Sequence, residues 1–135
     1  QKILLASLPR VLPHLRVDNG LKPEFVSRDP DVVKAYKADA LVHRRISAGL
    51  AAWILQNGEK TLVDAAKWDV PTLLLYAGQD RLVNAQASAD FAQAAPAAVV
   101  QAQCFEGMYH EIFNDLYRAQ VFTALKRWLL ARFSV

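Results

Sequence analysis

Residues 70–80 read Val70-Pro-Thr-Leu-Leu-Leu-Tyr-Ala-Gly-Gln-Asp80, and they decide the fold. Pro71 stops a preceding helix, and the unbroken apolar run Thr72–Tyr76 is typical of a strand buried on both faces of a parallel sheet. Gly78-Gln79 then marks a turn after the strand. The stretch therefore predicts an α/β fold in which Asp80 stands just past the end of a strand.

The residues after Asp80 continue the α/β pattern. Asn84 is a suitable N-cap for a helix from about Ala85 to Ala95, which Pro96 ends. A second strand is expected over residues 99–105, and a last helix over about 116–133. The apolar face expected on that helix consists of Val121, Leu125, Trp128 and Leu129. Strand, helix, strand and helix at these lengths predict a parallel unit with a right-handed crossover.

Residues 1–69 predict helices joined by polar loops, and no strand. Prolines interrupt the first apolar segment, so we expect a short or broken helix over residues 2–15. Asp29-Pro30 predicts a helix start, with Asp as N-cap and Pro at the first position, and that helix should reach about Ala38. A longer helix is expected from residue 42 or 44 to 66, with Gly49 as a close-packing position and Gly58 as a candidate break. We therefore divide the chain into a helical region (1–69) and a parallel α/β core (70–135).

Composition argues for a globular protein that does not bind nucleic acid. The chain has 135 residues, of which 53% are hydrophobic and 21% charged, and its formal net charge is +3. Its densest basic cluster, His43-Arg44-Arg45, is too short for the positive stripe that a nucleic-acid backbone requires.

The sequence implies neither a metal nor an organic cofactor. Its single cysteine, Cys104, excludes an internal disulfide, gives no metal-ligand spacing, and lies in a strand-like run typical of a buried free thiol.

The apolar start of the chain is too short to span a membrane, and no signal peptide is visible. We expect a cytoplasmic protein. Residues 3–12 either pack on the core or make weak contact with a membrane surface.

Asp80 and His110 form the candidate chemical site. His110 follows the second expected strand in Glu106-Gly-Met-Tyr-His110, and sites in open α/β sheets form past the carboxyl ends of the strands. An aspartate after a strand is usually a turn former, and a lone loop histidine is usually a packing or solvated residue. An acid followed by a histidine, each after a strand, is nevertheless the back half of the order Ser, Asp, His found in one class of hydrolases.

The nucleophile of such a triad is absent from this sequence. A serine on a Gly-x-Ser-x-Gly turn is required, and no serine here has glycines at both places. The five serines are Ser7, Ser27, Ser47, Ser88 and Ser134. We therefore expect this chain to be the C-terminal portion of a hydrolase, inactive alone.

Two motifs resemble those of monoacylglycerol lipases and lysophospholipase-like relatives within the α/β-hydrolase superfamily. The first covers residues 70–83 and ends in Asp80-Arg-Leu-Val83, and the second is Gly107-Met-Tyr-His110-Glu-Ile-Phe-Asn-Asp115. Residues 31–43, Asp-Val-Val-Lys-Ala-Tyr-Lys-Ala-Asp-Ala-Leu-Val-His, are similar to the helical cap of these lipases, although Ala40 stands where the family tends to have proline.

The resemblance implies a fold, a mechanism and a substrate. The fold would be the C-terminal part of an α/β-hydrolase sheet preceded by a helical cap, with Asp80 and His110 as triad acid and base. The substrate would be a monoacylglycerol or a lysophospholipid-like ester, with Tyr36 near its polar head and Leu55 and Leu82 along its acyl chain. Each of these three could equally be a packing residue.

Two alternatives stay open. One is a non-catalytic fragment that self-associates or pairs with the missing N-terminal half. The other is the same fold with another chemistry, as in thioesterases, amidases or dehalogenases.

Overall fold

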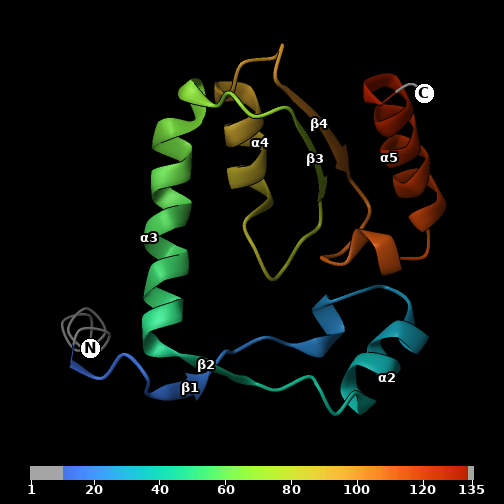
Figure 1. Cartoon of the computed structure of the whole chain (residues 1–135). Helices are drawn as coiled ribbons and strands as arrows, with labels where there is room; N and C mark the ends of the chain where they lie inside the picture. Colours follow the sequence, from blue (N-terminus) through green and yellow to red (C-terminus); the bar gives the residue numbers. More distant parts are fainter. Residues whose placement is uncertain (1–10, 134–135) are drawn as a thin grey trace.

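The computed structural model describes residues 11–133 and places a two-stranded parallel sheet at the centre of the α/β region (Figure 1). Strand β3 (Thr72–Ala77) pairs with β4 (Val100–Phe105), in a register that sets Thr72 opposite Val100. Helix α4 (Ala85–Ala94) connects them, and the side chain of Asn84 caps it by accepting the N–H of Gln86. The predicted strand–helix–strand order is confirmed, and each observed end of these three elements lies within about one residue of the predicted end.

Helices lie on both faces of this sheet, as Figure 1 shows: α4 and α3 (Ala48–Asp64) on one side and α5 (Arg118–Arg132) on the other. Alternate residues of β3 point to opposite faces. Leu74 therefore packs with the cluster on the α4 side, whereas Leu75 and Ala77 belong to the cluster on the α5 side. The buried residues on the α4 side are Ala65, Phe91, Ala95 and Val100, and those on the α5 side are Ala77, Phe105, Met108, Ile112, Val121 and Ala124.

The inward face of α5 differs in part from the prediction. Val121 and Ala124 are its buried residues, whereas Leu129, expected on the same face, is 41% exposed. The buried positions lie in the first half of the helix, and Leu125 and Trp128, also expected on this face, are half-buried.

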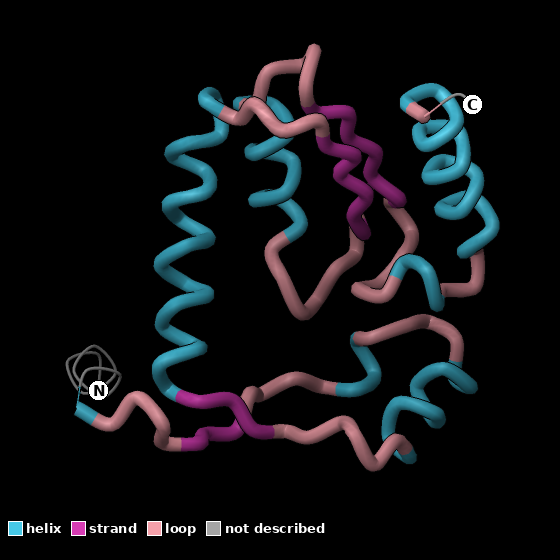
Figure 2. Tube along the Cα trace, viewed as in Figure 1, coloured by secondary structure: helices cyan, strands magenta, loops and turns pink. Residues whose placement is uncertain are grey.

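The expectation that residues 1–69 contain no strand is wrong. β1 (Arg16–Asp18) and β2 (Arg45–Ser47) form an antiparallel pair in which Val17 lies opposite Ile46 (Figure 2). Each strand has three residues and one central apolar side chain, which is too little to show the period-2 alternation of a strand. Contacts between residues about thirty positions apart hold this pair together, and a local pattern does not report them.

The helices of this region agree with the prediction except at two points. α2 (Pro30–Ala38) begins at the predicted cap, where the side chain of Asp29 accepts the N–H of Asp31. α3 begins later than predicted, because residues 45–47 belong to β2, and Ser47 is its N-cap. α3 also continues through Gly58, which is not a break.

Gly49 is the close-packing position that the sequence suggested. A Cβ atom there would lie 3.1 Å from the carbonyl oxygen of Pro13. Residues 11–133 also contain three short 3-10 helices: η1 (Pro23–Phe25), η2 (Ala65–Lys67) and η3 (Ile112–Asn114). Residues 2–10 of the expected broken helix, and most of the apolar segment 3–12, lie outside the described residues, whereas residues 12–15 are turn and loop rather than helix.

The segment before α2 meets the carboxyl ends of the parallel strands. β1, β2 and α2 lie beyond those ends in Figure 1. Residues 26–29, here called the anchor segment, contact the loop 106–117, here called the His110 loop, through the hydrogen bond from Glu111 N–H to the carbonyl of Val26. Within residues 11–133, no helix is both long enough and apolar enough to cross a membrane.

Candidate active site

The two loops that follow β3 and β4 are bonded to each other. The N–H of Gly78 donates to the carbonyl of Phe105 at 3.0 Å, and the N–H of Gln79 donates to that of Met108 at 3.1 Å. A Cβ atom on Gly78 would lie only 2.6 Å from the Cα of Glu106, so the backbones approach more closely than any side chain allows. This contact places the residues after each strand side by side.

Asp80 uses its two carboxylate oxygens for different partners. Oδ1 accepts the backbone N–H groups of Leu82 at 2.8 Å and Val83 at 3.0 Å, and Oδ2 lies 2.8 Å from Nδ1 of His110. The Asp80 side chain is only 6% exposed. The two backbone hydrogen bonds to Oδ1 therefore fix the orientation of the Asp80 carboxylate independently of its contact with the imidazole.

The imidazole of His110 is held at one edge and open at the other. A carboxylate only accepts hydrogen bonds, so Nδ1 must be the donor, which leaves Nε2 as the nitrogen that can accept a proton. The His110 side chain is 38% exposed. Its orientation and tautomer are those that a general base needs when Asp80 holds it from behind. The structure thus brings together the two residues that the sequence proposed as a pair.

Buried groups anchor the backbone on both sides of His110. Met108 is 2% exposed and Ile112 is 6% exposed, and both belong to the core on the α5 side. The N–H of Tyr109 donates to Oδ2 of Asp115 at 3.3 Å, and the N–H of Glu111 donates to the carbonyl of Val26 at 2.9 Å.

Asp115 and Arg28 form a partly buried ion pair that sequence reasoning did not identify. Arg28 donates from Nε (3.1 Å) and from its terminal nitrogen (2.6 Å) to Oδ1 of Asp115, whose side chain has no exposure. Burial raises the pKa of Asp115, but hydrogen bonds from Arg28 and from the Tyr109 and Arg28 backbones outweigh burial and lower it. Asp115 is the last residue of the motif Gly107–Asp115, yet no local sequence pattern links it to an arginine 87 positions earlier.

A second arginine, Arg81, links the loop after β3 to the His110 loop and to η1, which precedes the anchor segment. The guanidinium of Arg81 lies over the ring of Phe25 at 5.2 Å and over that of Tyr109 at 5.0 Å, measured to the ring centroids. These two cation–π contacts join the loop of Asp80 to the loop of His110 and to the residues beside the anchor segment.

The three proposed substrate residues lie in different surroundings. Leu82 is half-buried, and its backbone N–H bonds Asp80. Tyr36 is half-buried on α2 and lines a cavity of about 610 Å³. Leu55 lies on α3 and is 71% exposed. The structure places Leu82 at the candidate pair; it gives no contact of Tyr36 or Leu55 with that pair.

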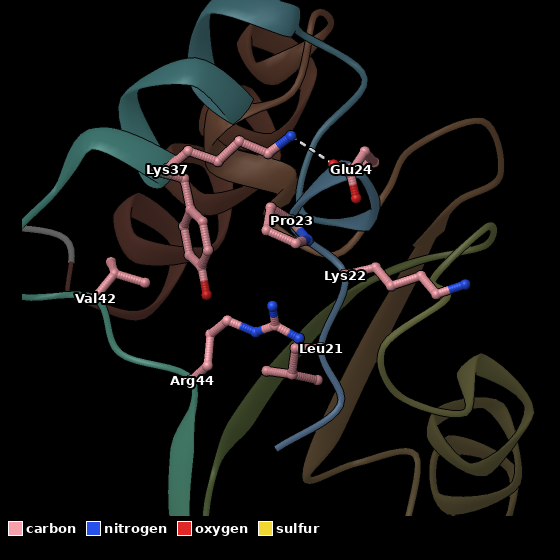
Figure 3. Close-up of a pocket in the computed structure, with 8 residues that line it drawn as sticks. Leu21, Lys22, Pro23, Glu24, Lys37, Val42 and Arg44 are labelled. Atoms are coloured by element: carbon pink, nitrogen blue, oxygen red, sulfur yellow. Dashed lines mark hydrogen bonds and ion pairs between the residues drawn. The ribbon is translucent and has the colours of Figure 1, made fainter. Parts of the chain in front are cut away.

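Figure 3 shows the cavity that Tyr36 lines. The side chains of Arg44, Val42 and Leu21 face its interior, and Lys37 is paired with Glu24 at its rim. All of its lining residues come from the region before α3.

Cys104 is unsuited to replace the missing serine. It is half-buried on β4, and burial, followed by its hydrogen bond to the Glu106 carboxylate, raises the pKa of its thiol. A thiol with a raised pKa is not a thiolate at neutral pH, and the thiolate is the nucleophile. Among residues 11–133, no cluster of three His, Cys, Asp or Glu side chains could hold a metal ion.

A family model described as serine aminopeptidase, S33, matches residues 1–117. Over 125 residues the chain is 32% identical to a monoacylglycerol lipase of Mycolicibacterium smegmatis, covering 92% of this chain and 44% of that protein. It is also 32% identical over 117 residues to phospholipase YtpA of Bacillus subtilis, covering 86% of this chain and 45% of that protein.

A solved structure agrees with these relatives. The crystal structure of the monoacylglycerol lipase of Paleococcus ferrophilus superimposes with a TM-score of 0.89 at 34% identity, covering 96% of this chain and 51% of that one. The chain thus spans about half the length of these proteins or less. Their similarity covers both the helical region and the parallel core.

Proposed function

Because this chain belongs to the serine aminopeptidase S33 family and is similar throughout to monoacylglycerol-lipase-like α/β-hydrolases, we propose that it provides the acid and the base of a serine ester hydrolase. The nucleophilic serine and the oxyanion-hole donors would come from sequence outside these 135 residues. On this proposal the chain alone is inactive, because the imidazole has no hydroxyl to activate.

The observation that supports the proposal is the 2.8 Å contact between Nδ1 of His110 and Oδ2 of Asp80, with Oδ1 already held by two backbone N–H groups. In the proposed reaction Nε2 of His110 takes the serine proton while the serine oxygen attacks the ester carbonyl. The same nitrogen then protonates the leaving alcohol, giving an acyl-enzyme. Water repeats the sequence and releases the acid, while Asp80 stabilises the imidazolium throughout.

We propose a monoacyl lipid ester as substrate. Two relatives are named as a monoacylglycerol lipase and a phospholipase, which supports this class over the amide substrates that the family description suggests. In this proposal Leu82 and Leu55 contact the acyl chain and Tyr36 contacts the polar head. Thioester, amide and carbon–halogen substrates are the alternatives that the same Asp–His pair would serve.

A non-catalytic, self-associating chain is the second candidate, and a specific observation favours it. Large apolar side chains are exposed on two helices, including Trp53 (61%) and Ile54 (49%) on α3 and Phe122 (51%) and Leu130 (60%) on α5. In the described part of the chain β3 pairs only with β4, so its other edge is open to another strand. Light scattering on the isolated chain tests this: oligomers support it, and a monomer that unfolds cooperatively contradicts it.

The hydrolase proposal is tested in the complete protein with His110→Ala. We expect ester turnover to fall by several orders of magnitude, while His14→Ala, which changes an exposed histidine, leaves it unchanged. Matched ester, thioester and amide substrates with the same acyl chain identify the chemistry. Unchanged ester turnover in His110→Ala would contradict the proposal.

A further inference from the structure

The Arg28–Asp115 pair joins segments that the sequence separates by 87 positions. Arg28 belongs to the anchor segment that leads into α2, and Asp115 ends the stretch that begins at His110. The pair is bidentate, because the terminal guanidinium nitrogen donates to Oδ1 while Nε lies within hydrogen-bond distance of both Oδ1 and Oδ2. The backbone N–H of Arg28 also donates to Oδ2. A planar guanidinium bonded in this way fixes direction as well as distance.

The same carboxylate also holds the residue before His110. Oδ2 of Asp115 accepts the backbone N–H of Tyr109, so one buried group bonds both the anchor segment and the His110 loop. Because Tyr109 directly precedes His110, a displacement of Asp115 moves the peptide from which the imidazole extends.

The residue after His110 is bonded to the anchor segment as well. Glu111 N–H donates to the carbonyl of Val26, and Ser27 Oγ donates to the carbonyl of Asn114 at 3.0 Å. Val26 and Ser27 are each only 2% exposed. The backbone on either side of His110 is therefore set by contacts with residues 26–28 and Asp115.

We infer that Arg28 and Asp115 are positioning residues, which set the orientation of His110 and make it depend on docking of the anchor segment. The inference rests on the proposed function, in which His110 is the general base. Neither residue needs to touch the substrate. Their effect passes through the Tyr109 peptide to the His110 Nδ1–Asp80 contact.

The test compares Arg28→Lys and Asp115→Asn with wild type in the complete protein. Lysine keeps the positive charge but cannot form the bidentate contact, and asparagine keeps the shape but loses the charge. We expect kcat on a monoacyl ester to fall by about 100-fold in Asp115→Asn and by less in Arg28→Lys, with KM nearly unchanged, because a small misplacement of a catalytic group acts on the chemical step. The control is Asp64→Asn, which removes an α3 carboxylate paired with Lys60 and Lys67 away from this junction.

A second readout does not require activity. The proton on Nδ1 of His110 should give a far-downfield NMR resonance, assigned by its loss in Asp80→Asn. The positioning role predicts that this resonance is lost or shifted in Arg28→Lys while Asp64→Asn retains it. Wild type that shows the resonance but no hydrolysis would defeat the proposed function and leave the positioning test intact.

Three outcomes overturn the inference. The first is a wild-type kcat together with an unchanged resonance in both folded variants. The second is a loss confined to KM. The third is global unfolding of both variants, seen by circular dichroism, because the pair would then stabilise the fold rather than position the base.

Discussion

At the scale of single residues, the different partners of the two Asp80 carboxylate oxygens suit this residue to the role of acid in the proposed triad. Oδ1 is fixed by the N–H groups of Leu82 and Val83, and only Oδ2 is directed at His110. An amide in its place would present either a donor or a weaker acceptor to Nδ1, which favours the wrong tautomer.

Asp80→Asn should therefore lower kcat by about 10³- to 10⁴-fold with the fold intact. Steady-state kinetics of the complete protein measure this change. Asp90→Asn, an exposed carboxylate on α4 that bonds Gln86, is the matched control. Equal activities of the two variants would remove Asp80 from the mechanism.

Gly78 is the residue at which backbone geometry matters most. Because Gly78 has no side chain, the backbone of Glu106 can lie close to it. A Cβ atom on residue 78 would lie only 2.6 Å from the Cα atom of Glu106. The neighbour is backbone, so it cannot rotate away, and the loops of Asp80 and His110 would have to separate.

Gly78→Ala should destabilise the protein by about 1–3 kcal/mol, the usual cost of inserting a methyl group into a packed site. Gly58→Ala is the contrasting control, because nothing lies within 4 Å of its Cβ position and alanine is the better helix former. Urea denaturation should show opposite changes in the free energy of unfolding. Destabilisation of equal size in both would show that the close approach is not the cause.

At the scale of elements, α3 depends on a cap that its sequence pattern did not reveal. The Ser47 side chain accepts the N–H of Leu50 at 3.1 Å, and Ser47 is also the last residue of β2. One residue therefore ends a strand and begins a helix.

Ser47→Ala should lower the free energy of unfolding by about 1 kcal/mol, because a helix N–H loses its acceptor. Ser47→Asn, which supplies another side-chain oxygen, should restore most of it. Thermal unfolding of the two variants beside wild type measures the difference, and identical melting temperatures for Ala and Asn would exclude capping as the role of Ser47.

The elements that could be predicted from sequence are those with strong local signals. Asp29-Pro30 and Asn84 carry capping chemistry, and the apolar run before Asp80 is long enough to mark a strand. β1 and β2 could not be predicted, because three residues with one apolar side chain give no periodicity. The candidate site followed the same rule: Asp80 and His110 stand next to strands, whereas the Arg28–Asp115 pair depends on long-range packing.

At the scale of the whole molecule, that ion pair links the segment before α2 to the parallel core, so its titration affects the entire fold. The pKa of Asp115 is lower in the folded protein than its ordinary value of 3.8. A group whose folded pKa is depressed contributes stability above its unfolded pKa, and that stability is lost as pH falls through the folded pKa.

The free energy of unfolding should therefore fall as pH decreases below about 4, and it should fall less in Asp115→Asn, which has no carboxyl to protonate. Urea titrations between neutral and acidic pH measure both slopes. Asp90→Asn, which changes an exposed carboxylate on α4, serves as the control. If the free energy of unfolding falls with decreasing pH equally in wild type and in Asp115→Asn, another group causes the loss of stability at acidic pH.

The exposed faces of α3 and α5 and the open edge of β3 belong to the same scale. In the described residues they are exposed apolar surfaces and an open strand edge, and the chain spans about half of a solved relative with the same fold. In the proposed function, a serine from outside these 135 residues lies at Nε2 of His110.

Fluorophosphonate labelling of the complete protein, located by mass spectrometry of its peptides, tests that claim most directly. We expect one labelled serine outside this sequence in wild type, and labelling that is slowed by several orders of magnitude in His110→Ala. Labelling of wild type and His110→Ala at equal rates, or no label in a protein that hydrolyses the ester, would contradict it.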